Sequence, residues 1–158
     1  MQALGWVYRN QNRVDDAIGV YRDVLPRYET LVGKEHFAWL HIAIELVLLE
    51  SKRTPESALV LATELYSRVD SLNPSSQYRL RGLTAYGVAL AANGEYEASV
   101  PILEKAFHGN LEHRRPRHPH TAEAGVNLAR VLDKLERSAE ALAVRERMKA
   151  AATQGDKL

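Results

Sequence analysis

Histidines and arginines gather between positions 108 and 120, and these side chains are the first to test for chemistry. The members are His108, His113, Arg114, Arg115, Arg117, His118 and His120. A metal site needs ligands that converge, often two histidines on one helical face, whereas Pro116 and Pro119 break this segment into a loop. Contact with phosphate or nucleic acid is the alternative, but no aromatic residues are interleaved. We expect a solvated loop, with no metal and no nucleic-acid partner.

Acid–base and nucleophilic chemistry finds little support in the sequence. His41, Glu45 and Asp133 are ionisable candidates, but no spacing typical of a nucleophile, a base and an orienting group surrounds them. The glycine patterns of dinucleotide-binding and phosphate-binding loops are missing from the sequence. We therefore expect no enzyme and no cofactor.

Composition sets further bounds. The chain has 158 residues, 21 lysines and arginines against 20 aspartates and glutamates, and no cysteine. Near-neutral charge gives no bulk attraction to nucleic acid or to an anionic membrane. The longest apolar stretch, Ile42 to Leu49, contains Glu45 and is far shorter than the ~20 residues of a membrane span. A chain without disulfides is compatible with a reducing cytosol, so a cytoplasmic location is expected.

The elements that must position any site are helices. Apolar residues recur at steps of one, three and four from Ala17 to Leu31 and from Ala58 to Leu72, which places one stripe on one helical face. Pro26 should kink its helix or end it early. The expected helices are 1–11, 14–31, 36–52, 54–71, 75–93, 95–112, 118–135 and 138–153.

An internal repeat of 41 to 42 residues organises these helices. Small residues recur early in every second helix, at Ala17, Ala58, Ser99 and Ala141. Twelve residues before them stand Gly5, Leu46, Gly87 and Ala129, and the turns between contain Asn12, Arg53, Gly94 and Glu136. Small residues at these places let two antiparallel helices approach closely, and such hairpins must stack to bury their apolar faces.

The pattern resembles the tetratricopeptide repeat. Leu4-Gly5-x-x-Tyr8 matches the L-G-x-x-Y signature of that family, and Tyr96-Glu97-Ala98-Ser99 and Asn127-Leu128-Ala129 match its later positions. The long period, Pro101, and His118-Pro119-His120-Thr121 before a first helix are similar to the kinesin-light-chain type. Repeat two departs from the pattern at Glu45 and Leu46.

The resemblance implies an all-α fold: an α-solenoid of about four antiparallel helix–turn–helix hairpins in a right-handed superhelix. We expect one domain over 1–153, with repeats near 1–33, 34–74, 75–115 and 116–153, and a tail at 154–158. Met1 falls inside the expected first helix, so the chain is expected to be part of a longer protein.

The family binds partners along the concave face formed by its first helices, and the matching positions here predict a groove that is apolar in the middle. Those positions are Gln2, Trp6, Arg9, Asn10, Ala43, Ile44, Val47, Glu50, Arg81, Thr84, Ala85, Val88, Glu123, Val126, Asn127 and Arg130. Ala43, Ile44, Val47 and Val88 are alternatively core residues.

Two functions follow as hypotheses. The first is a protein-interaction scaffold, part of a larger regulatory or signalling protein, that binds a peptide or domain in the groove. The second is a sensor domain in which a peptide or other ligand shifts the superhelix to control an effector. Self-association through the ends of the solenoid stays open.

Overall fold

The computed structural model describes residues 2–113 and 118–154, and these residues form helices with no strand among them. The helices are α1 (Gln2–Asn10), α2 (Val14–Val32), α3 (Phe37–Glu50), α4 (Pro55–Val69), α5 (Gln77–Ala92), α6 (Tyr96–His113), α7 (Pro119–Lys134) and α8 (Ser138–Gln154). Each bound lies within two residues of its predicted value.

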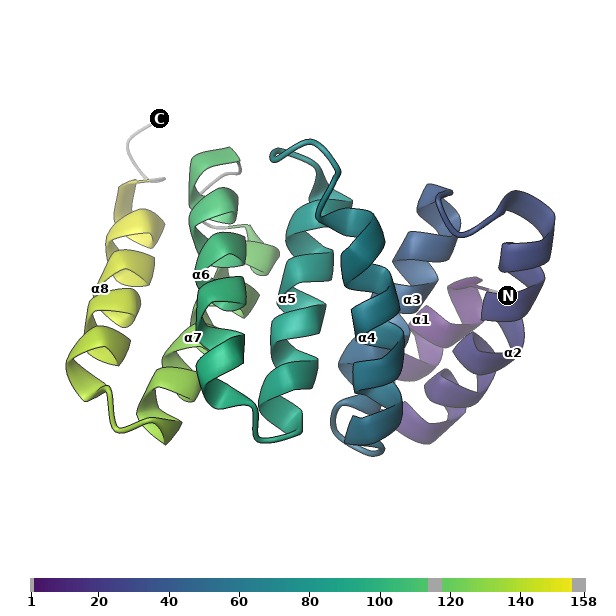
Figure 1. Ribbon diagram of the computed structural model, residues 1–158, viewed down its shortest axis with the longest axis horizontal. Coiled ribbons are helices and arrows are strands. Elements are labelled where there is room, and N and C mark those ends of the chain that lie inside the picture. Colours follow the sequence, from purple (N-terminus) through teal and green to yellow (C-terminus); the bar gives the residue numbers. More distant parts are fainter. Residues whose placement is uncertain (1, 114–117, 155–158) are drawn as a thin grey trace.

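The helices stack as successive hairpins. Every helix packs against the next along the chain, and α3 also contacts α5 while α5 contacts α7. Figure 1 shows the result as an elongated array from α1 and α2 at one end to α8 at the other, with α1, α3 and α7 behind α2, α4 and α6. The contacts of α3 with α5 and of α5 with α7 join the first helices of successive hairpins, and the predicted all-α solenoid is confirmed.

Small residues hold each hairpin together, as the repeat predicts. Ala17, Ala58, Ser99 and Ala141 are fully buried. A Cβ on Gly5 would lie 2.7 Å from the Tyr21 ring, and one on Gly87 would lie 2.6 Å from Cγ of Leu103. The Ser99 hydroxyl also donates a hydrogen bond of 2.8 Å to the Gly87 carbonyl. The close approach of the two helices leaves no room for larger residues.

The turns between the paired helices share one backbone conformation in three of the four repeats. Asn12, Gly94 and Glu136 have φ values of 60°, 82° and 60°. Glycine adopts this left-handed region freely and asparagine tolerates it, whereas glutamate does so at a cost. Arg53, at the same position of repeat two, has no positive φ.

Two first helices begin with a histidine cap. The Nδ1 atoms of His36 and His118 each accept a hydrogen bond of 3.2 Å, from the backbone N–H of Ala38 and of His120 respectively. An acceptor at this position satisfies one of the amides that a helix start leaves without a partner. These caps give a physical role to the histidines that recur 82 residues apart.

Helix α2 continues through Pro26 to Val32. It therefore does not end at Pro26, which was one of the two expected effects of this proline. A proline removes one backbone hydrogen bond, but burial of Ala17, Ile18, Tyr21 and Val24 anchors the helix on its inner face. Within the described residues, no helix is long and apolar enough to cross a membrane.

Candidate functional site

A buried carboxylate connects the first three repeats on the layer of first helices. Glu45 on α3 is 4% exposed and accepts hydrogen bonds from Arg9 on α1 and from Arg81 on α5. Arg81 also contacts Nδ1 of His41 at 3.3 Å. A buried charge needs partners of opposite sign, and Glu45 finds one in each neighbouring repeat. Glu45, which the sequence offered as an acid–base candidate, serves here as an ion-pair partner.

This network shifts the proton affinities of its neighbours. Burial lowers the pKa of His41 below its ordinary value, and the charges of Arg81 and Arg9 lower it further against the opposing charge of Glu45. Burial, with the Glu45 charge, raises the pKa of Tyr21. A hydrogen bond with His120 lowers the pKa of Glu123. The cluster therefore favours neutral His41 and ionised Glu123.

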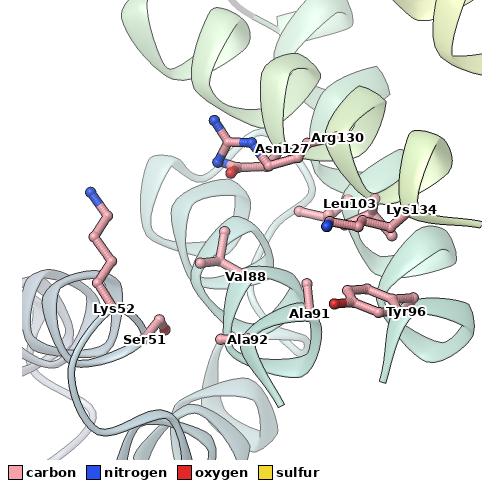
Figure 2. Close-up of a pocket in the computed structure, with 11 residues that line it drawn as sticks. Ser51, Lys52, Val88, Ala91, Ala92, Tyr96, Leu103, Asn127, Arg130 and Lys134 are labelled. Atoms are coloured by element: carbon pink, nitrogen blue, oxygen red, sulfur yellow. The ribbon is translucent and has the colours of Figure 1, made fainter. Parts of the chain in front are cut away.

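A cavity of about 240 Å³ opens between the turn that follows α3 and helices α5, α6 and α7. Figure 2 shows Val88, Ala91 and Ala92 of α5 between Lys52 on one side and Arg130 and Lys134 of α7 on the other. Leu103 and Tyr96 of α6 complete the floor. The lining has an apolar base, three cations at the rim and no acidic residue.

A second, larger cavity of about 450 Å³ adjoins the first. Its lining reaches from Arg9 on α1 to Glu123, Val126, Asn127 and Arg130 on α7. Asn127 and Arg130 line both cavities, so the two lie next to each other along α7. We call the combined surface the α7 groove.

The α7 groove brings together six of the predicted site residues. They are Arg9, Val88, Glu123, Val126, Asn127 and Arg130. Trp6 and Asn10 are exposed on α1 but line neither cavity. Arg81 is bound to Glu45, and the side chain of Gln2 lies outside the described residues.

The remaining predicted groove positions of repeats two and three are buried, as the alternative assignment of Ala43, Ile44 and Val47 to the core expects. Ala43, Ile44, Val47 and Ala85 are completely buried and belong to the core cluster that joins α3, α4 and α5. Every residue of α3 from Ile42 to Val47 is buried, so this helix has no free face there.

Two polar groove predictions are also buried. Glu50 is 2% exposed, and its carboxylate accepts a 2.5 Å hydrogen bond from Nε of Arg22 on α2. Thr84 is 3% exposed and donates to the Leu80 carbonyl within its own helix. Neither side chain offers a partner any surface.

Sequence reasoning missed most residues of the smaller cavity. They are Ser51, Lys52, Ala91, Ala92, Tyr96, Leu103, Val131 and Lys134. Lys134 lies one turn beyond Arg130 on the same face of α7, so helical periodicity could have included it. Tyr96 and Leu103 come from a second helix, and no pattern in the first helices points to them.

Part of the histidine–arginine segment lies outside the described residues, namely 114–117, which contain all three arginines. Of the described part, His118 caps α7 and His120 lines the larger cavity. No cluster of three or more histidine, aspartate or glutamate side chains suited to a metal ion occurs in 2–113 or 118–154.

Comparison with known proteins places this geometry in a class. A family model described as tetratricopeptide repeat matches residues 1–38. A crystal structure of a putative kinesin light chain from Podosopora anserina, with nearly identical tetratricopeptide-like repeats, is 20% identical, with a TM-score of 0.71 over 99% of this chain and 75% of that one. A variant of that protein with one substitution gives a TM-score of 0.76 at the same identity and coverage.

A third structure shows the same fold. BtubC (BKLC) from P. vanneervenii is 18% identical, with a TM-score of 0.75 over 98% of this chain and 63% of that chain. No curated protein matches the sequence.

The fold and the groove define a helical-repeat solenoid. A tetratricopeptide-repeat model matches its first 38 residues, and the fold of the chain is that of kinesin-light-chain-like repeat structures, as the sequence predicts. Tetratricopeptide repeats generally mediate interactions between proteins, and repeat scaffolds of this kind are typically not enzymes.

Proposed function

We propose that this chain is a protein-interaction scaffold that binds a peptide or a domain of a partner in the α7 groove. The observation that carries the proposal is the adjacency of the two cavities, which share Asn127 and Arg130. Together they offer apolar side chains from α5 and α7 beside charged groups at the rim, a combination typical of protein-binding sites. A cytoplasmic location and a place in a larger regulatory or signalling protein are parts of this proposal.

The test compares partners captured from a lysate of the source organism. The immobilised wild type is set beside Val126→Asp/Arg130→Glu, two changes at exposed positions of the groove. The control is Val60→Asp/Lys149→Glu, which makes equivalent changes at exposed positions of α4 and α8. We expect a protein held by the wild type and the control but lost by the groove variant, with all three melting alike. Equal capture by all three would contradict the proposal.

A second function, ligand sensing, is favoured by the position of Arg9. This residue lines the larger cavity and also binds Glu45, which lies on α3. A ligand that takes Arg9 as its own partner removes the ion pair between α1 and α3. Sensing then requires faster amide hydrogen exchange in α1 when ligand binds, and unchanged or slower exchange there would contradict it.

A further inference from the structure

The three cations at the rim of the smaller cavity have no partner among the described residues. Lys52, Arg130 and Lys134 form no ion pair and no side-chain hydrogen bond with the residues of 2–113 and 118–154. Most other basic side chains of the described residues are paired with an acid: Arg145 binds Asp133, for example, and Lys149 binds Glu146 at 2.8 Å. The charge at this rim is therefore uncompensated within the described chain.

The cavity beneath these cations is small. Its volume of about 240 Å³ lies below the roughly 300–1,000 Å³ of pockets that enclose a small-molecule ligand. The floor is made of Val88, Ala91, Leu103 and the Tyr96 ring. Covering such a surface with an aliphatic group is favourable, because apolar area is removed from water.

We propose that the smaller cavity takes one aliphatic side chain of an acidic peptide segment, whose flanking carboxylates pair with Lys52, Arg130 and Lys134. The proposal rests on the function proposed above and names the chemistry of its partner. Charge complementarity selects carboxylates, because the rim presents three cations and no acid. The apolar floor selects a segment with an aliphatic residue between its acids over a uniformly charged one.

The position of the larger cavity beside the smaller one favours a chain as the occupant. Arg130 and Asn127 lead from the small cavity to Glu123 and His120, where the lining carries both signs of charge. An extended segment anchored in the small cavity continues along α7 into this mixed surface. A phosphate backbone also matches the three cations, but the acidic Glu123 and the apolar floor disfavour it, so an oligonucleotide belongs in the test.

The experiment measures fluorescence anisotropy of labelled peptides on the whole chain. The probe is fluorescein-Gly-Glu-Asp-Leu-Asp-Glu-Gly. The matched peptides are Gly-Gln-Asn-Leu-Asn-Gln-Gly, which lacks charge, and Gly-Glu-Asp-Ser-Asp-Glu-Gly, which lacks the aliphatic side chain. We expect the probe to bind roughly tenfold tighter than either, as several partly exposed ion pairs together allow. Its affinity should fall as salt rises.

Charge reversal then locates the binding site. Lys52→Glu and Lys134→Glu should each weaken the probe and leave the uncharged peptide unchanged, and the neutral pair Lys52→Gln/Lys134→Gln should weaken it by less. The control is Lys149→Glu, an exposed change of equal charge on α8, which should bind as the wild type does. Both lysines of the cavity are exposed, so the variants should melt like the wild type.

The outcomes separate this inference from the proposed function. Equal binding of the acidic and uncharged peptides, both lost on Val126→Asp/Arg130→Glu, would overturn the acidic chemistry and retain the groove. Tighter binding of a uridine oligonucleotide than of the probe would also overturn it. Loss on Lys149→Glu equal to that on Lys52→Glu would assign the effect to net charge and overturn the site. Probe binding that no groove change affects would overturn both proposals.

Discussion

At the scale of single residues, Glu136 has an unfavourable backbone conformation that one substitution should relieve. Its φ of 60° lies in the left-handed region, which is unfavourable by about 1 kcal/mol or more for a residue with a Cβ. Glu136→Gly should therefore raise stability. The gain should be only about 0.5 kcal/mol, because the greater freedom of glycine in the unfolded chain offsets part of it. Thermal unfolding checks the sign. Arg53→Gly is the control: Arg53 has no positive φ, so this change should not stabilise.

His41 should make stability depend on pH. Its pKa is lowered in the folded state, chiefly by burial, from an unfolded value near 6.5. Below that pH the unfolded chain binds more protons than the folded chain, so stability should fall as pH decreases from 7 to 5. The lowered pKa of Glu123 adds a separate loss below about 4.5. His41→Gln should flatten the slope of unfolding free energy between pH 7 and 5, and an unchanged slope would assign it to another group.

At the scale of elements, the two glycines Gly87 and Gly19 should respond in opposite ways to the same substitution. A Cβ on Gly87 meets Cγ of the buried Leu103 at 2.6 Å, whereas one on Gly19 meets nothing within 4 Å. Gly87→Leu should destabilise by about 1–3 kcal/mol or more, because the α5–α6 hairpin must open. Gly19→Leu should stabilise by up to about 1 kcal/mol through helix propensity. Chemical denaturation of both variants measures the contrast, and equal effects would contradict the repeat register.

Helix positions could be predicted from the sequence, but the exposure of a repeat position could not. Caps, turns and apolar spacing are local, so they predicted both ends of all eight helices to within two residues of the structure. Val47, Val88 and Arg130 occupy one register position in successive repeats, yet Val47 is buried, Val88 is half-buried and Arg130 is exposed. Burial there depends on how α3 packs against its neighbours, which the repeat pattern does not encode. Several of the predicted groove residues are therefore buried, which the repeat pattern alone did not decide.

At the scale of the whole molecule, the ion pairs of Glu45 link the second repeat to both of its neighbours. Contacts between first helices join α3 to α5 and α5 to α7, while α1 is attached mainly through α2. The Arg9–Glu45 pair is therefore the polar link from α1 to α3. In a solenoid, stability is approximately a sum of repeat and interface contributions, so each link should be removable separately.

Arg9→Gln and Glu45→Ala should consequently differ in how much they destabilise the protein and in which helices they affect. Arg9 has a side chain 40% exposed, so its loss should cost less than about 1 kcal/mol and should speed amide exchange only in α1. Glu45→Ala also leaves the Arg81 side chain, 10% exposed, without its carboxylate, which should cost about 3 kcal/mol or more across α3 and α5. Glu45→Leu/Arg81→Leu removes both buried charges and should recover most of that loss. Global destabilisation by Arg9→Gln equal to that of Glu45→Ala would mean that α1 is held by more than this link.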